Sequence, residues 1–453
     1  MKIELLIAEI GSTTTIVNAF NGVKGNDPKY VGSGFAATSV EKGDVRIGLE
    51  QATENLAKSL QTDKIEYCEM FATSSAAGGL KMTVHGLVYD MTVKAAKEAA
   101  LGAGGVICHA TAGKLNEYDL ADIEEIQPKL ILLAGGTDYG ERETQIHNAM
   151  MLCKLKIKPP VIYAGNVQCV RQIESIFQES GIKCYIVENV YPKLDLLNIE
   201  PTRKIIHEVF TEHIVKAQGM EHIRERVSGA IIPTPGAVME ATQLLYKAIG
   251  DCVTIDIGGA TTDVHSATEG SDEIAAISLY PEPKFKRTVE GDLGVYVNAK
   301  SVAKLFDERR IKQTGLDIEK CLKEIKPLPK SEDEINFVTE LAIMAGETAI
   351  KRHVGQLRTI YGSNGRQVYA EGKDLSKIKY IIATGGALTK LKSRDKIMQK
   401  LADVNVNGSM LYPKIESVKI LYDNDYIMAS VGVMSKTYPE AAIKLLKKSL
   451  NID

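Results

Sequence analysis

Two segments about half the chain apart share one pattern, and this internal repeat constrains the fold more than any other feature. EIGSTTT, Glu9 to Thr15, aligns without a gap with DIGGATT, Asp256 to Thr262. Each segment follows an apolar run typical of a buried strand and continues into further β-type sequence. Each therefore predicts a hairpin turn between two strands, with an acid just before the turn. A hairpin repeated in this way predicts two related lobes that hold one ligand between them.

The composition of the two turns suits a polyphosphate together with its cation. Glycines allow backbone amides to approach anionic oxygens, and threonine or serine hydroxyls add hydrogen-bond donors. Carboxylates repel phosphate, so their expected role is to hold Mg²⁺, usually through its waters, and to orient an attacking water or hydroxyl. We assign this metal-binding and catalytic role to Glu9, Asp256 and Asp263. The predicted phosphate-binding residues are Gly11, Ser12, Thr13, Thr14, Gly258, Gly259, Ala260, Thr261 and Thr262.

A third segment, YIIATGGALTKL from Tyr380 to Leu391, has a strand that ends at two glycines and a helical pattern behind them. Glycines at this point allow a flat ligand such as an adenosine to lie against the backbone. We therefore predict contact with an adenosine at Gly385, Gly386 and Ala387. The pattern by itself is common, and an ordinary strand-to-helix turn is the alternative.

In this order, the three segments resemble the phosphate-1, phosphate-2 and adenosine motifs of the actin, Hsp70 and sugar-kinase ATPase superfamily. The resemblance runs from Ile3 to about Leu391 and excludes Leu130–Val190. It implies an α/β, two-lobed actin-like ATPase fold of duplicated RNase H-like domains, with ATP and Mg²⁺ as cofactors.

Four segments are similar to one branch of this superfamily, the GlmL/MutL accessory proteins of the glutamate mutase system. These segments are AEIGSTTT, TSSAAGGLKMTVHGLV, LAGGTDYGERE and DIGGATTDVHS. The resemblance implies an ATP-driven chaperone or reactivating factor for an adenosylcobalamin-dependent mutase, which frees the mutase of damaged cobalamin. Two rival functions in the same superfamily are a small-molecule kinase and an actin-like, nucleotide-dependent scaffold.

Two positions depart from the pattern of the superfamily. Glu9 stands where the family has an aspartate, and Ile232 stands where Hsp70-like proteins have an acid before a proline–threonine pair. One carboxylate fewer around the metal predicts slow ATP hydrolysis, or binding with little turnover. The simpler alternatives are a turn cap for Asp256 and a polar hairpin position for Asp263.

The order of β-type and helical patterns predicts an α/β protein with a doubly wound insertion in its first lobe. We expect the first lobe at residues 1–75 and 230–250, and the second lobe at 251–432. The inserted subdomain at 76–229 is the predicted partner-binding part, and a helix at 433–453 is expected to pack on the first lobe. Phe337–Tyr361 predicts one long helix, and Lys323–Glu334 predicts a charged surface loop.

Two glycine-rich segments have more than one interpretation. Thr73–Leu87 is either a ligand loop or a flexible entry to the insertion. Ala134–Glu143 is expected to be a partner-facing loop or a structural turn, rather than a second nucleotide site.

Composition limits the remaining partners and the compartment. The net charge of −3 favours neither nucleic acid nor an anionic membrane as a partner. The seven cysteines form no C-x-x-C pair or Cys/His array, so we expect neither a zinc site nor a disulfide framework. Acids interrupt the short apolar run at the N-terminus, which is untypical of a signal peptide, and no run suits a membrane helix. We therefore expect a cytoplasmic protein.

Overall fold

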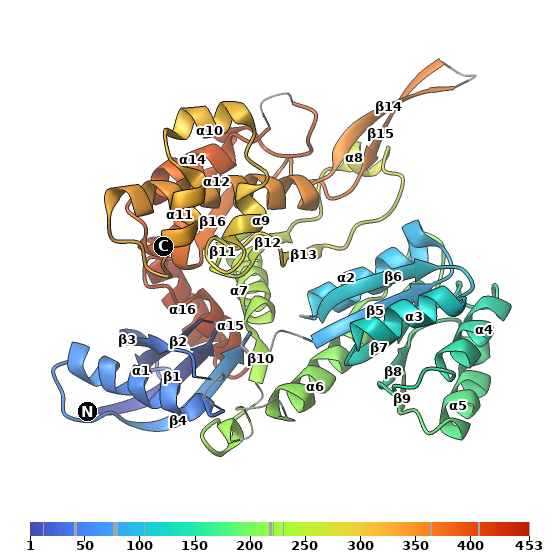
Figure 1. Cartoon of the computed structure of the whole chain (residues 1–453), viewed down its shortest axis with the longest axis horizontal. Helices are drawn as coiled ribbons and strands as arrows, with labels where there is room; N and C mark the ends of the chain where they lie inside the picture. Colours follow the sequence, from blue (N-terminus) through green and yellow to red (C-terminus); the bar gives the residue numbers. More distant parts are fainter. Residues whose placement is uncertain are drawn as a thin grey trace.

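The fold is described from a computed structural model of the chain, shown in Figure 1. It describes residues 1–11, 13–39, 43–75, 80–103, 105–216, 220, 222–229, 231–362, 365–405 and 408–452. Among these residues, no helix combines the length and the apolar character that a membrane crossing requires.

The first lobe is built on a five-stranded sheet with the order β10-β4-β1-β2-β3. The strands β1, β2 and β3 form an antiparallel meander, and β4 and β10 continue the sheet parallel to β1. Helix α1 (Val45–Ser59) covers the face of β2 and β3. The strands are β1 (Lys2–Ile10), β2 (Thr14–Asn21), β3 (Lys29–Ala37), β4 (Glu66–Ser74) and β10 (Ile231–Pro233).

The second lobe repeats this sheet, strand for strand. Its order is β13-β12-β11-β16-β17, again with an antiparallel meander followed by two parallel strands. The strands are β11 (Cys252–Ile257), β12 (Thr262–Ala267), β13 (Phe285–Glu290), β16 (Tyr380–Thr384) and β17 (Lys419–Tyr422). The two matching sheets confirm the predicted two-lobed, actin-like fold of duplicated domains.

Helices of the second lobe surround this sheet, and the longest of them is α12. They are α8 (Asp272–Ala275), α9 (Ala299–Ala303), α10 (Glu308–Thr314), α11 (Ile318–Glu324), α12 (Glu332–His353), α13 (Gly386–Lys390) and α14 (Arg394–Ala402). The predicted helix Phe337–Tyr361 was wrong beyond His353. From Gln356 the chain forms a hairpin, β14 (Gln356–Gly362) with β15 (Gly365–Glu371), because its β-branched and aromatic residues favour a strand.

The insertion lies in the chain between β4 and β10 and forms a third, all-parallel sheet with the order β6-β5-β7-β8-β9. Its strands are β5 (Leu80–Gly86), β6 (Gly105–Ala112), β7 (Leu130–Leu133), β8 (Val161–Tyr163) and β9 (Cys184–Ile186). Helices α2 (Lys94–Gly102) and α6 (Glu200–Lys216) cover one face. The other face packs against α3 (Glu117–Ile126), α4 (Glu143–Leu152) and α5 (Val170–Glu179). This arrangement confirms a doubly wound insertion.

The glycine-rich segment Thr73–Leu87 was predicted as a ligand loop or a flexible entry to the insertion; the structure shows strands over most of it, while Ser75 lines a cavity between the lobes. Thr73 and Ser74 end β4, and Leu80–Gly86 is the whole of β5. Residues 76–79, between the two strands, lie outside the described part of the chain. Apart from Lys81, the residues of β5 are buried in the sheet. This burial favours a strand more strongly than the small and polar composition of the segment favours a loop.

Helices α7 (Thr234–Ile249) and α15 (Met428–Met434) join the two lobes and cross at Gly432. A Cβ atom at Gly432 would lie 1.8 Å from the Ala237 carbonyl oxygen, so only glycine allows this approach. Helix α16 (Pro439–Ser449) follows and contacts the first lobe, where Lys444 Nζ donates to the Asn26 carbonyl at 3.0 Å. Apolar side chains of both lobes share the core around these helices.

Candidate functional site

The two turns of the internal repeat have the same backbone geometry. The Gly11 amide donates to the Thr14 carbonyl at 3.0 Å, and the Gly258 amide donates to the Thr261 carbonyl at 2.9 Å. Each turn joins the two central antiparallel strands of its lobe, β1 with β2 and β11 with β12. The predicted hairpins are therefore confirmed, including the acid just before each turn.

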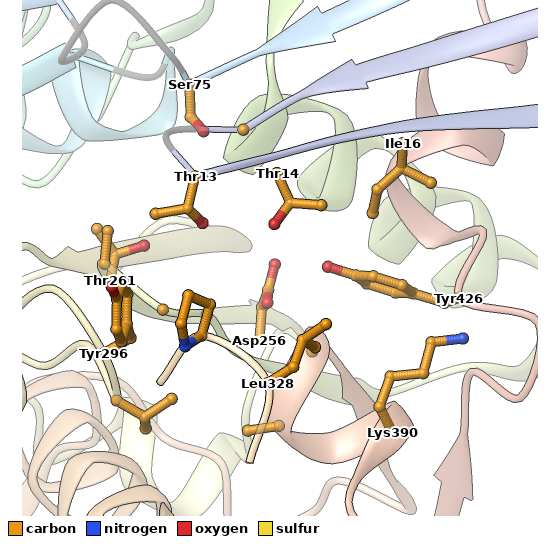
Figure 2. Close-up of a pocket in the computed structure, with 18 of the residues that line it drawn as sticks. Thr13, Thr14, Ile16, Ser75, Asp256, Thr261, Tyr296, Leu328, Lys390 and Tyr426 are labelled. Atoms are coloured by element: carbon orange, nitrogen blue, oxygen red, sulfur yellow. The ribbon is translucent and has the colours of Figure 1, made fainter. Parts of the chain in front are cut away.

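Both turns line a single cavity between the lobes. Figure 2 shows the Thr13 and Thr14 hydroxyls pointing into this cavity from one side and the Asp256 carboxylate from the other. Glu9 faces the same cavity as Asp256, although they belong to different lobes. The predicted residues that line it are Glu9, Gly11, Thr13, Thr14, Asp256, Gly258, Gly259, Ala260, Thr261, Asp263, Gly386 and Ala387.

Three predicted residues are not among those that line the cavity in the described part of the chain. Ser12 is outside the described residues. Thr262 is completely buried and its hydroxyl donates to the Leu293 carbonyl at 2.6 Å, so the predicted phosphate contact is wrong for this residue. Gly385 does not line the cavity but supports it, because a Cβ atom there would lie 2.3 Å from Asp256 Oδ1. Its φ of +85° also favours glycine.

The acids of the cavity are held in an environment that opposes negative charge. Burial raises the pKa of Glu9 to about 8, and the nearby charges of Asp256 and Asp423 add to this. Burial and Asp423 raise the pKa of Asp256 to about 7. Burial also raises the pKa of Asp263, with a further contribution from Asp256. A cation placed among these groups favours their ionised forms, so the site is electrostatically suited to one.

The residues fit a hydrated divalent cation better than a directly ligated one. Among the described residues, no group of three His, Cys, Asp or Glu side chains is arranged to hold a metal directly. Asp263 is 2% exposed, and its Oδ1 atom has no hydrogen-bond partner in the described structure. Mg²⁺ usually keeps several of its waters and binds through one or two carboxylates and substrate phosphates. Glu9, Asp256 and Asp263 are the residues that would hold such an ion.

The comparison with known proteins decides the family. A family model described as MutL protein matches residues 5–450. The chain belongs to the MutL family. It is 36% identical over 462 residues to Protein MutL of Clostridium tetanomorphum, with 98% of each chain covered. The family predicted from the sequence is confirmed.

Solved structures similar to this MutL-family chain have low scores. Nucleotide-free acetone carboxylase gives a TM-score of 0.37 at 10% identity, covering 96% of this chain and 70% of that chain. Nucleotide-free diol dehydratase-reactivating factor also gives a TM-score of 0.37 at 10% identity, covering 97% of this chain and 100% of that chain. The fold assignment therefore depends on the sheet topology of the chain itself.

Asp423 is a buried carboxylate of the site that sequence reasoning missed. It accepts four hydrogen bonds, from Thr384 Oγ1, the amides of Ile427 and Met428, and Ser449 Oγ, at 2.8–3.1 Å. These bonds join β16, the start of α15 and the end of α16. Its charge lies close enough to raise the pKa of both Glu9 and Asp256. Asp423 therefore does not line the cavity but lies close behind it in the fold's hydrogen-bond network, and it raises the pKa of two acids that do line it.

Tyr426 and Lys390 form a second missed feature. Figure 2 shows the Tyr426 hydroxyl directed toward Asp256, with Lys390 beside it. Tyr426 has a φ of +54°, which is unusual for an aromatic residue and marks a strained position. Lys390 Nζ lies 5.3 Å from the ring centre of Phe35 in the first lobe and 5.7 Å from that of Tyr426. These contacts join the two lobes at the mouth of the cavity.

The segment Lys326–Pro329 lines the cavity, although the sequence predicted only a charged surface loop. Its position follows from the cap of α12. Glu334 accepts from Lys326 Nζ at 2.6 Å and from the amides of Lys330 and Ser331 at 2.6 and 3.1 Å. This cap holds Leu328, whose side chain is 70% exposed, over the cavity. The capping box beginning at Ser331 was the sequence signal for this arrangement.

The segment Ala134–Glu143 forms a structural turn, one of its predicted alternatives. Asp138 Oδ1 accepts from the Val167 amide and from Asn189 Nδ2, both at 3.0 Å, and Asn166 Oδ1 accepts from the Tyr139 amide at 3.1 Å. These bonds tie together the loops that follow β7, β8 and β9 in the insertion. The segment contributes no residue to the cavity lining, and Tyr139 is 77% exposed.

Proposed function

We propose that this MutL-family chain binds ATP with Mg²⁺ in the cavity between its lobes. The observation that carries the proposal is the convergence of Glu9 and Asp256, each beside a glycine turn of the same geometry, on one cavity. The Thr13, Thr14 and Thr261 side chains supply donors for phosphates, and Gly386 and Ala387 supply a flat surface for the adenosine. In this proposal Glu9, Asp256 and Asp263 hold the hydrated cation.

We further propose that hydrolysis is slow. Ile232 stands at the position where Hsp70-like proteins have an acid. It lies on β10 opposite Thr73 of β4 and brings no carboxylate to the cavity. Glu9 takes the place of a shorter aspartate, and its raised pKa leaves it partly protonated near neutral pH. A site with these acids favours binding and lobe closure over rapid turnover.

The partner that we propose is an adenosylcobalamin-dependent carbon-skeleton mutase of the glutamate mutase type. The chain would act as an ATP-dependent chaperone that releases damaged cobalamin from this enzyme. Membership of the MutL family supports this role, and the large insertion supplies a surface outside the ATP-binding core. The proposal places the protein in the cytoplasm, where the mutase would be found.

The test combines nucleotide binding with the exchange of cobalamin. The purified chain is titrated with ATP and Mg²⁺ by calorimetry, and hydrolysis is measured with and without the cognate mutase. The mutase is first loaded with an inactive cobalamin, and its recovery of activity with adenosylcobalamin is followed. We expect recovery to require both ATP and this chain. Recovery that proceeds equally without the chain contradicts the chaperone role, and a phosphorylated metabolite formed instead favours a kinase.

A further inference from the structure

The insertion contacts the second lobe through charged side chains that are largely removed from solvent. Lys94 of α2 lies 2.5 Å from Glu282, and Lys286 of β13 lies 2.8 Å from Glu282 and 3.8 Å from Glu98 of α2. The Glu98, Glu282 and Lys286 side chains are each exposed by 9% or less. Figure 1 shows α2 beside β13, the edge strand of the second sheet. An interface of this kind is specific, because separation leaves uncompensated buried charges.

Arg287 of β13 forms a second contact with α2 at this junction. Its side chain is completely buried, and its Nη2 atom donates a hydrogen bond to the Leu101 carbonyl. Leu101 lies in the last turn of α2, where backbone carbonyls lack partners within the helix. A cation at the C-terminus of a helix also interacts favourably with the helix dipole. An arginine of the second lobe therefore caps a helix of the insertion.

The same arginine lies beside an acid of the proposed nucleotide site. In the pairing of β12 with β13, Asp263 is opposite Val289 and His265 is opposite Arg287. Alternate residues of a strand share a face, so Arg287 and Asp263 are diagonal neighbours on one face, within reach of a long side chain. Their charges influence each other: Arg287 opposes the rise in the pKa of Asp263 that burial causes, and Asp263 opposes the fall in the pKa of Arg287.

The hydrogen bonds of this junction are incomplete. Among the described residues, Asp263 Oδ1 has no donor, and Arg287 Nε and Nη1 have no acceptor. Both side chains are buried, at 2% and 0% exposure, so these atoms are not compensated by bulk water. The guanidinium therefore has two competing attractions, the Asp263 carboxylate on one side and the Leu101 carbonyl on the other.

We propose that Arg287 is a positioning residue shared by Asp263 and the C-terminus of α2, and that it couples nucleotide binding to the docking of the insertion. The inference rests on the proposed function, because Asp263 must lie beside a Mg²⁺-nucleotide. A divalent cation in the cavity draws the Asp263 carboxyl group toward itself and repels the guanidinium, so Arg287 is left to the Leu101 carbonyl. Nucleotide binding therefore strengthens the contact between α2 and β13.

Hydrogen–deuterium exchange of the full chain tests this coupling. Peptides that cover α2 are compared without ligand and with saturating Mg²⁺ and ADP, with saturation set for each variant by calorimetry. In the unmodified chain we expect exchange in α2 to slow several-fold on binding. Arg287→Met should lose this response, and Arg287→Lys should keep part of it because it keeps the charge. Arg310→Met is the matched control, because Arg310 forms ion pairs with Glu340 and Glu347 inside the second lobe and should leave the response intact.

A second variant keeps the inference testable if the Arg287 variants fail to fold. Asp263→Ala removes the competing carboxyl group whether or not it is ionised, so without any ligand its α2 should already exchange as slowly as in the loaded chain. Slow exchange in this variant supports the coupling. Unchanged exchange in Asp263→Ala, or a full response in Arg287→Met, overturns the coupling and leaves nucleotide binding standing. If calorimetry detects no nucleotide uptake by the unmodified chain, the proposed function fails, and the coupling fails with it.

Discussion

The substitution Asp256→Asn tests the electrostatics of the cavity, because it removes one negative charge and preserves the shape of the side chain. The pKa of Asp256 rises from the usual 3.8 to about 7 in the folded chain. The folded state therefore binds more protons than the unfolded state between these values, and its stability falls as the pH rises through this window. Asparagine carries no charge at any pH and avoids this loss. We expect the variant to be more stable than the unmodified chain at alkaline pH.

The magnitude follows from the shift. A rise of about three pKa units corresponds to about 4 kcal/mol of lost stability once the group is fully ionised, at 1.36 kcal/mol per unit. Asp256 is partly exposed to the cavity, and solvent screening reduces this figure, so we expect about 1–4 kcal/mol. The apparent Tm should rise by about 2–4 °C for each kcal/mol. Because about pH 5 lies only about 1.2 units above the usual 3.8, less than half of this difference is present there, and the two proteins should differ less than at about pH 8.5.

Asp423→Asn is the matched control, since it makes the same chemical change in the same cluster. Asp423 accepts four hydrogen bonds, two at each carboxylate oxygen. An amide nitrogen cannot accept, so at least one backbone amide, that of Ile427 or Met428, loses its partner. A buried donor without an acceptor costs about 1–3 kcal/mol. This variant should therefore be less stable than the unmodified chain at about pH 5, and any gain from the removed charge at about pH 8.5 should be smaller than that of Asp256→Asn.

Thermal unfolding at about pH 5 and about pH 8.5 provides the measurement, and calorimetric titration with ATP and Mg²⁺ accompanies it. Asp256→Asn should combine a raised Tm at the higher pH with loss of Mg²⁺-dependent nucleotide binding. Such a combination is typical of functional acids, which are retained at a cost in stability. An Asp256→Asn protein that is no more stable at about pH 8.5, or equally stabilised at about pH 5, refutes the electrostatic reasoning.

Three further predictions follow from other parts of the structure. Gly432→Ala should lower the apparent Tm, because its Cβ would lie 1.8 Å from the Ala237 carbonyl oxygen and overpacking costs about 1–3 kcal/mol; Gly291→Ala, which meets nothing within 4 Å, is the control and should not. Glu334→Gln should weaken ATP binding severalfold in calorimetry, because it loosens the cap that holds Leu328 over the cavity. An unchanged affinity would show that this loop does not contribute to ATP binding. Removal of Mg²⁺ with a chelator should weaken ATP binding more at about pH 8.5 than at about pH 6, because the acids with raised pKa values are ionised at the higher pH and then repel the phosphates.

The parts of the fold that the sequence predicted are those with a strong local pattern. The sequence predicted a strand before each of two glycine pairs, and the structure has these strands at Cys252–Ile257 and Tyr380–Thr384. Continuous apolar runs that end at glycine pairs leave little choice of conformation or boundary. The repeat of acid, glycine and threonine then predicted the matching turns. The helix expected over Phe337–Tyr361 failed at its end, because a strand hairpin competes there with helical periodicity.

The missing parts of the site depend on tertiary contacts that no local pattern encodes. Asp423 lies in the segment YDNDY, which has the composition of an exposed turn. It is buried because β17 pairs with β16, and because the start of α15 and the end of α16 both donate hydrogen bonds to its carboxylate. Arg287 is a single arginine on the edge strand β13. Its hydrogen bond to α2 forms only when the insertion packs against the second lobe. The motif predicted that Thr262 contacts a ligand, but its hydroxyl donates a hydrogen bond to the Leu293 carbonyl instead.

The path of the chain gives the insertion a role in any movement of the lobes. The chain enters the insertion from β4 and returns through α6 to β10, so both covalent connections belong to the first lobe. Its buried ion pairs, in contrast, join it to β13 and Glu282 of the second lobe. Breaking one buried pair costs about 3–5 kcal/mol, because a charge is left without its partner. A rotation of the lobes about the crossing of α7 and α15 would therefore either break these pairs or strain the core that the insertion shares with the first lobe. We expect closure of the cavity around a nucleotide to change, in this way, the surface that the insertion offers to a partner.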